Sequence, residues 1–244
     1  MVAGELLLDG QAGVTVARTK STPTDVVTAM DTAAEALLRS VLVGARPHDG
    51  MLGEEGGETV GTSGVRWIVD PLDGTVNYLY GLPGWGISVA AEVAGEVVVG
   101  VVNVPTWQTM FVATRGGGAW ANDVAVQASS ANDLAQALVA TGFGYDAQRR
   151  AEQAAALPGL LPRIRDVRRF GAAASDLCLL AAGRVDAYFE RGLSVWDLAA
   201  GRLIAQEAGA LVEVRADASR GDLVIGAGPA LFPALAALLE DAGA

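Results

Sequence analysis

One stretch of the chain decides its fold: residues 65–77, which read VRWIVDPLDGTVN. Val65 to Val69 is a short apolar run of the kind that forms a buried strand. Pro71 cannot donate to a sheet and disfavours a helical backbone at the preceding Asp70, so we expect the strand to end there. Asp73-Gly74-Thr75 then has the pattern of a helix start, with a capping aspartate and a glycine that allows close approach of the backbone.

Two carboxylates therefore leave one strand end, three residues apart, beside the free N–H groups of a helix start. Carboxylate and carbonyl oxygens suit a hard divalent cation, and helix-start N–H groups suit a phosphate. The simpler alternative is a turn in which Asp70 and Asp73 cap the backbone and face water. A motif this short does not decide between the two.

The composition narrows the class of protein. The chain has 244 residues, 51% of them hydrophobic and 18% charged, which is enough for a sizeable core in one large domain or two closely packed ones. The net charge of −11 argues against a nucleic-acid-binding face, which needs a basic patch. A small phosphorylated substrate is not excluded, because bound metal ions can supply local positive charge.

The composition also indicates the cellular compartment of the protein. The single cysteine, Cys178, excludes an internal disulfide and fits a reducing compartment. The most apolar stretch, residues 86–104, is interrupted by Glu92, Gly95 and Glu96, so it predicts a hairpin and not a membrane span. We expect a cytoplasmic protein with no membrane or nucleic-acid partner.

The first half of the chain has the pattern of an antiparallel sheet. The strands expected there are residues 14–20, 25–30, 65–69, 85–93, 96–104, 109–114 and 119–126. Asp31 is expected to cap a helix that runs to about Val43, and such a cap is compatible with a functional role. Glu54 and Glu55 stand side by side between glycines, where like charges repel. A solvated loop would explain this pair, and a bound cation would explain it better.

The second half alternates strands and helices, which implies a parallel or mixed sheet. The strands expected are residues 139–142, 185–189, 210–214 and 222–227, and the helices are residues 148–157, 171–182, 196–208 and 229–239. We therefore expect two halves that pack as one compact unit. Residues 1–128 would carry most of the acidic candidates, and residues 129–244 would complete the site.

Acidic residues stand at several of these junctions. Glu54, Asp70 and Asp73 lie in the first half, and Asp197 follows Trp196 at a strand-to-helix junction of the second. Such a group suits a two-metal phosphoryl-transfer site, in which ions roughly 3.5–4 Å apart hold the attacking and leaving oxygens. Carboxylates that close would repel one another without metal, so the group would be costly without a function.

Three motifs resemble those of the inositol monophosphatase family, the lithium-sensitive, magnesium-dependent phosphatases. They are Gly53-Glu54-Glu55, Asp70-Pro71-Leu72-Asp73-Gly74-Thr75 and Trp196-Asp197. The resemblance covers nearly the whole chain, from Lys20 to Gly209 and beyond. It implies an α/β (α+β) fold, a layered αβαβα sandwich, most often assembled as a homodimer. It also implies a phosphomonoesterase that holds two or three Mg²⁺ ions.

The resemblance implies a metal-binding role for five residues. Glu54, Asp70 and the carbonyl oxygen of Leu72 would hold the ion that activates water. Asp70, Asp73 and Asp197 would hold the second ion, beside the leaving alkoxide. A third and weaker ion would lie near Glu54.

Catalytic and substrate roles follow from the same resemblance. The catalytic residues would be Glu54, Asp31 and Thr75, with Thr75 orienting the water and Asp31 helping to take its proton. The substrate contacts implied are Asp73, Gly74, Thr75, Gly171, Ala173, Glu190 and Asp197. Because metal lowers the pKa of bound water, no histidine is needed, which suits a chain whose only histidine is His48 in a predicted turn.

The resemblance defines the reaction more closely than it defines the substrate. Family members act on inositol 1-phosphate, fructose 1,6-bisphosphate, histidinol phosphate or adenosine 3′,5′-bisphosphate with one metal core. Residues 78–83 and 189–192 look most like the inositol 1-phosphate branch, in which Glu190 would accept hydrogen bonds from polyol hydroxyls. A solvated strand-end glutamate is the alternative for that residue. Histidinol-phosphatase or fructose-1,6-bisphosphatase activity is the second hypothesis, and a non-catalytic regulator is the third.

Overall fold

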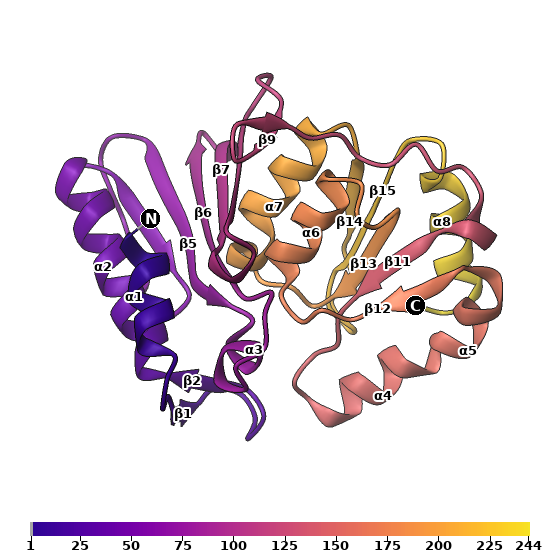
Figure 1. The fold of residues 1–244 in the computed structure, drawn as a ribbon, viewed down its shortest axis with the longest axis horizontal. Coiled ribbons are helices and arrows are strands. Elements are labelled where there is room, and N and C mark those ends of the chain that lie inside the picture. Colours follow the sequence, from indigo (N-terminus) through magenta and orange to yellow (C-terminus); the bar gives the residue numbers. More distant parts are fainter. Residues whose placement is uncertain (1) are drawn as a thin grey trace.

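Five layers of secondary structure build the molecule, in the order α, β, α, β, α (Figure 1). The computed structural model describes residues 2–244, and Met1 lies outside them. One group of buried apolar side chains lies on the outer side of each sheet, and the largest surrounds the central helices between the two sheets. The α/β (α+β) fold and the layered αβαβα sandwich implied by the family resemblance are therefore confirmed.

Each helical layer packs against a sheet. The outer layer beside the N-terminus contains α1 (Val2–Gly10) and α2 (Ala29–Ala45), the central layer contains α6 (Ala173–Ala181) and α7 (Val195–Glu207), and the far layer contains α5 (Leu157–Leu160) and α8 (Phe232–Asp241). Leu231, Leu235 and Leu238 at α8 are fully buried within the chain, so these leucines belong to its core. No helix within residues 2–244 combines the length and apolarity needed to cross a bilayer.

The larger sheet has eight strands in the order β10-β9-β8-β7-β6-β5-β3-β4. Their bounds are β3 (Gly50–Gly53), β4 (Gly57–Thr59), β5 (Val65–Asp73), β6 (Gly86–Val93), β7 (Glu96–Val104), β8 (Thr109–Thr114), β9 (Ala119–Ala121) and β10 (Val124–Ala125). β5 pairs in parallel with β3 and antiparallel with β6. A separate antiparallel pair, β1 (Val16–Thr19) and β2 (Val26–Thr28), precedes α2.

The predicted end of the central strand at Asp70 is wrong. β5 continues to Asp73, because its pairing with β6 shifts register between Asp70 and Asp73. The irregularity falls at Pro71, which has no N–H to donate to an ordinary ladder. The strand therefore turns at this point while its next residues stay beside β6.

The smaller sheet has five strands in the order β12-β11-β13-β15-β14. They are β11 (Leu138–Thr141), β12 (Asp166–Arg168), β13 (Ala187–Arg191), β14 (Leu211–Arg215) and β15 (Leu223–Ala227). β11 pairs in parallel with β12 and β13, whereas β15 pairs antiparallel with β13 and β14. This is the mixed sheet that the alternating pattern predicted.

One segment that was predicted as a single strand forms two strands. Residues 119–126 form β9 and β10, joined by Asn122 and Asp123, which both have positive φ (45° and 66°). Two consecutive residues with positive φ make the tight turn that reverses a hairpin, and Asn and Asp tolerate this conformation better than most residues.

Candidate active site

A cavity of about 700 Å³ lies between the two halves of the chain, where β5, α6, β13 and the start of α7 come together. Every predicted site residue except Asp31 lines it. Asp31 lies next to the cavity wall and contacts the side chain of Thr75. The short helix α3 (Thr75–Leu79) begins at the same wall. The structure thus brings the predicted residues together, and the roles assigned to them stay predictions.

Asp70 is almost fully buried, with 2% of its surface exposed, so the alternative in which it faces water is wrong. Its Oδ1 accepts a hydrogen bond from the N–H of Leu72 at 3.0 Å, which closes the turn around Pro71. Burial, and the neighbouring charges of Glu54, Asp73 and Asp197, raise the pKa of Asp70 well above its usual range. A positive charge placed here would stabilise the ionised form.

Asp73 is not the helix cap that the sequence predicted. Gly74 precedes the first residue of α3 with φ of 88°, a conformation that glycine adopts readily, and it leaves no side chain to cap the helix. Asp73 instead accepts a hydrogen bond at 2.7 Å from the N–H of Ala174 in the first turn of α6. Burial and the nearby charge of Asp197 raise the pKa of Asp73 well above its usual range.

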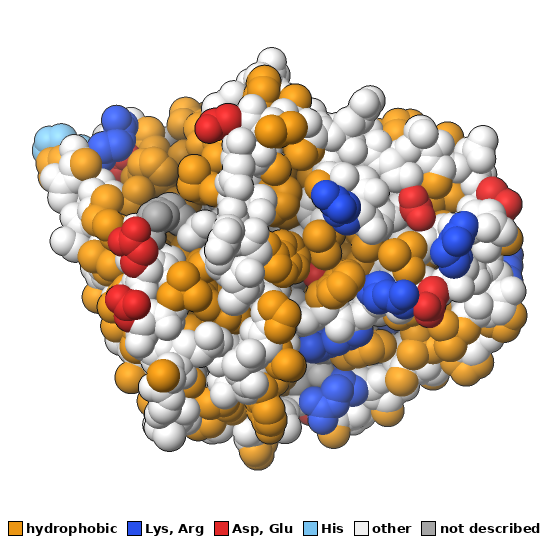
Figure 2. Space-filling model, viewed as in Figure 1, with side chains coloured by type: hydrophobic (Ala, Val, Ile, Leu, Met, Phe, Trp, Pro, Cys, Tyr) orange, Lys and Arg blue, Asp and Glu red, His pale blue; other side chains and the backbone are white. Residues whose placement is uncertain are grey.

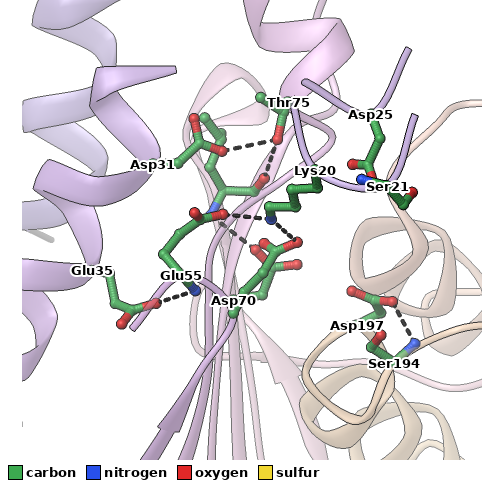
Figure 3. Close-up of polar contacts among 12 residues, drawn as sticks. Lys20, Ser21, Asp25, Asp31, Glu35, Glu55, Asp70, Thr75, Ser194 and Asp197 are labelled. Carbon is green, nitrogen blue, oxygen red and sulfur yellow. Dashed lines mark hydrogen bonds and ion pairs between the residues drawn. The ribbon is translucent and has the colours of Figure 1, made fainter. Parts of the chain in front are cut away.

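Glu54 lies in the turn between β3 and β4, and a lysine reaches it from the loop after β1. Lys20 Nζ is 2.7 Å from Oε1 of Glu54 and 2.5 Å from Oε1 of Glu55 (Figure 3). Arg18 also pairs with Glu55. Basic side chains of this chain thus explain how two adjacent glutamates are tolerated in one tight turn.

A side chain of α2 holds the turn that carries Glu54 in place. The side chain of Glu35 is buried, and one of its oxygens accepts the N–H of Glu55 at 2.8 Å (Figure 3). Its other oxygen accepts the N–H of Gly56 at 2.9 Å. A carboxylate that accepts two backbone N–H groups fixes the backbone between them. Glu35 therefore positions the neighbouring Glu54.

Asp31 is the third residue of α2 and not its cap. Thr28 is the N-cap, and Asp31 completes a capping box by accepting the N–H of Thr28 at 2.8 Å. Oδ1 of Asp31 lies 3.0 Å from the hydroxyl oxygen of Thr75, which also lies 3.1 Å from the carbonyl oxygen of Leu72 (Figure 3). A threonine hydroxyl has one proton, so it donates to only one of these two acceptors at a time.

Asp197 and Glu190 form the part of the wall that belongs to the second half. Asp197 accepts the N–H of Ser194, the N-cap of α7, at 2.7 Å, and burial raises the pKa of Asp197 to about 7. Glu190 on β13 accepts a hydrogen bond from the hydroxyl of Tyr188 at 2.8 Å, and burial raises its pKa to about 7 as well. Glu190 therefore faces the cavity and is not a solvated strand-end residue.

The acidic residues fit a hard divalent cation by their chemistry, although their side chains contact other partners. No three His, Cys, Asp or Glu side chains within residues 2–244 surround a common point as metal ligands do. Glu54 forms an ion pair with Lys20, Asp73 accepts a hydrogen bond from the N–H of Ala174, and Asp197 accepts one from the N–H of Ser194. The pKa values of Asp70, Asp73 and Asp197 are nevertheless raised, and a divalent cation would lower them again, because it binds the ionised carboxylates.

Sequence reasoning missed Lys20 and Glu35 as parts of this site. They contact the Glu54 turn across 34 and 20 residues of chain, respectively. Lys20 stands in a loop and Glu35 on a helix, and no short motif marks either one. Only the folded arrangement of α2 and of the β1–β2 hairpin reveals them.

Comparisons with known proteins agree with this geometry. The model of the inositol monophosphatase family matches residues 2–243. Inositol-1-monophosphatase of Mycobacterium leprae is 46% identical, over 95% of this chain and 84% of that protein. Nus factor SuhB of Pasteurella multocida is 43% identical, over 77% of this chain and 71% of that protein. The crystal structure of extragenic suppressor protein suhB from Bartonella henselae has a TM-score of 0.91 at 35% identity, covering 98% of this chain and 95% of that one. The chain belongs to the inositol monophosphatase family.

Proposed function

We propose that this phosphatase is a Mg²⁺-dependent phosphomonoesterase and that inositol 1-phosphate is its main substrate. The observation that supports this most strongly is the meeting of four acidic residues from three separate junctions in one cavity, namely Glu54, Asp70, Asp73 and Asp197. Their mutual repulsion is unfavourable unless positive charge is bound between them. The relative from Mycobacterium leprae, named as an inositol-1-monophosphatase, supports the choice of substrate.

Two or three Mg²⁺ ions would be held by these residues. Glu54, Asp70 and the carbonyl oxygen of Leu72 would hold the first ion, and Asp70, Asp73 and Asp197 the second, with a third near Glu54. When bound, Mg²⁺ lowers the pKa of water and neutralises charge on the phosphate.

The other residues of the wall would orient the reactants. The Thr75 hydroxyl would accept a hydrogen bond from the attacking water, and Asp31, 3.0 Å from that hydroxyl, would help to take the proton. The N–H groups of Gly74 and Thr75 would hold the phosphate oxygens. The water oxygen bonds to phosphorus, the P–O ester bond breaks, and the alcohol leaves with a proton.

The second half of the chain would bind the alcohol. Glu190 lines the cavity together with Gly171, which precedes α6, and Ala173, the first residue of α6. A carboxylate inside a cavity is a strong acceptor for the hydroxyls of a polyol. This favours inositol 1-phosphate over a substrate with few hydroxyls.

We also propose that the protein is a cytoplasmic homodimer and that lithium inhibits it. Asp70, Asp73 and Asp197 offer a small all-oxygen pocket, and Li⁺ is close to Mg²⁺ in size but has half its charge. Trp120 and Val124, 45% and 68% exposed on the outer edge of the larger sheet, are candidates for the dimer contact.

A phosphate-release screen tests the substrate assignment. The four phosphates are inositol 1-phosphate, histidinol phosphate, fructose 1,6-bisphosphate and adenosine 3′,5′-bisphosphate, each assayed with Mg²⁺ and with excess chelator. We expect the highest kcat/KM with inositol 1-phosphate and no turnover with chelator. A higher kcat/KM with histidinol phosphate would reassign the substrate. No turnover of any phosphate would favour a non-catalytic role, such as the name of the relative from Pasteurella multocida indicates for that protein.

A further inference from the structure

Within residues 2–244, every ion pair connects two residues of the same half of the chain, either 1–128 or 129–244. On the face shown in Figure 2, Lys and Arg side chains gather over the carboxy-terminal half. The arginines of that half that form ion pairs do so with its own carboxylates. Hydrogen bonds and packing therefore position the two halves on either side of the proposed active-site cavity.

Two short segments, one from each half, meet at this cavity. Residues 73–77 end β5 and begin α3, and residues 170–174 lead into α6. Ala172, the N-cap of α6, has no side-chain oxygen to cap the helix, so the carboxylate of Asp73 accepts the N–H of Ala174 instead. The first half of the chain thus caps a helix of the second.

Asn77 makes a second polar contact between the same segments. Its side chain is almost fully buried, with 6% of the residue surface exposed, and its Nδ2 donates a hydrogen bond to the carbonyl oxygen of Phe170 at 2.7 Å. Gly171, the next residue, has φ of 96°, a conformation that suits glycine. A Cβ on Gly171 would lie 3.2 Å from Oδ1 and 3.3 Å from Nδ2 of Asn77. The amide therefore fits closely against the turn at Gly171.

The helix that carries Asn77 is anchored separately in the first half. The hydroxyl of the fully buried Tyr78 donates to the carbonyl oxygen of Leu7 at 2.6 Å, and the side chain of Gln11 donates to the carbonyl oxygen of Tyr78 at 3.0 Å. Loss of the Asn77 amide therefore leaves α3 in place, whereas the turn at Gly171 loses a hydrogen bond to the first half.

We propose that Asn77 is a positioning residue, which holds the proposed substrate-binding turn at Gly171 at a fixed distance from the proposed phosphate-binding start of α3. This inference rests on the proposed function, which assigns these roles to the two segments. Asp73 is also a proposed metal ligand, so its contact with α6 competes with the metal ion, whereas the contact of Asn77 does not. A displacement of about 1 Å near the reacting groups can cost 10²-fold in rate, so this contact should affect catalysis.

Two substrates distinguish positioning from a general structural role. Inositol 1-phosphate would contact both segments, whereas 4-nitrophenyl phosphate has no hydroxyl for the turn at Gly171. In Asn77→Ala we expect kcat/KM for inositol 1-phosphate to fall by about 10–100-fold, because a buried carbonyl loses its donor and the turn is released. The kcat/KM for 4-nitrophenyl phosphate and the Mg²⁺ concentration that gives half the maximal rate should stay nearly unchanged. Asn77→Leu, which fills the space without a donor, should act in the same way.

Glu207→Ala is the matched control. Glu207 on α7 also joins the halves, because its carboxylate accepts the N–H groups of Gly116 at 2.8 Å and Gly118 at 3.0 Å, but it lies outside the cavity. Its substitution should leave the ratio of the two kcat/KM values unchanged.

Circular dichroism shows whether the Asn77 variants fold, which we expect of both. An unchanged ratio, equal losses with both substrates, or the same fall in Glu207→Ala would overturn the positioning role. Unfolding of both Asn77 variants would also overturn it, because Asn77 would then act on stability alone. No turnover of either substrate by the wild-type protein would instead overturn the proposed function.

Discussion

The ammonium nitrogen of Lys20 lies 2.7 Å from Oε1 of Glu54, on the wall proposed to bind the first Mg²⁺ (Figure 3). The same nitrogen lies 2.5 Å from Oε1 of the neighbouring Glu55. Lys20 therefore supplies positive charge to the acidic wall. A metal ion that binds Glu54 has to share this carboxylate with Lys20 or displace it.

Replacing Lys20 should destabilise the metal-free protein. Lys20→Met leaves Glu54 without its partner, and we expect the free energy of unfolding to fall by about 1–3 kcal/mol, between the values for exposed and buried pairs. Urea unfolding in chelator and in Mg²⁺ measures this, and Mg²⁺ should restore more stability to the variant than to the wild-type protein. Lys20→Arg, which keeps the charge, is the control. An unchanged free energy of unfolding in chelator would show that the lysine does not offset the repulsion.

The contact between Thr75 and Asp31 should carry part of the catalysis. We expect Thr75→Val and Asp31→Asn each to lower kcat by about 10²–10⁴, the usual range for a group that handles a proton, with little change in KM. Because both act on one water, the double variant should lose little more than either single one. Thr109→Val, remote from the cavity, is the control. Losses that multiply in the double variant would show that the two residues act independently.

The stability of the metal-free protein should depend on pH with a definite sign. The pKa values of Asp197 and Glu190 are both about 7 in the folded protein, above the ordinary values of 3.8 and 4.5. Between pH 4 and 7 the folded state therefore keeps protons that the unfolded chain releases, so the free energy of unfolding falls as pH rises.

Urea unfolding in chelator at several pH values between 5 and 8 measures this dependence. Asp197→Asn and Glu190→Gln should each flatten it, because an amide does not titrate. Mg²⁺ should also flatten it and release protons on binding near pH 6. A free energy of unfolding that rises over this range would contradict the raised pKa values.

Substitution of Glu190 should affect one class of substrate selectively. Glu190→Gln removes a charged acceptor, so we expect kcat/KM for inositol 1-phosphate to fall by about 10–100-fold. An aryl phosphate without hydroxyls, such as 4-nitrophenyl phosphate, should be hydrolysed nearly as before. Equal losses with both substrates would place Glu190 in general electrostatics and not in substrate recognition.

Much of the fold could be predicted because its signals are local. β7 and β8 have the bounds expected from their apolar patterns, 96–104 and 109–114, since a glycine-containing turn precedes β7 and another follows β8. The layered sandwich followed from the three acidic motifs through family resemblance. The division into residues 1–128 and 129–244 as functional halves stays a prediction.

What the sequence did not reveal depends on contacts between distant residues. The continuation of β5 past Pro71 requires β6 beside it, and the orientation of Asp73 requires the first turn of α6. The helix cap is Thr28 and not the predicted Asp31, because β2 ends at Thr28 and α2 begins at the next residue.

The most direct test of the account is phosphate release from inositol 1-phosphate at saturating Mg²⁺ by the wild-type protein and Asp70→Asn. Asp70 is proposed to bind both ions, so the variant should lose about 10²–10³ or more in kcat. Because the substitution also removes a buried like charge, the variant should be at least as stable as the wild-type protein in chelator. A folded Asp70→Asn protein with near-normal turnover would contradict the central claim that this carboxylate holds the catalytic metal ions.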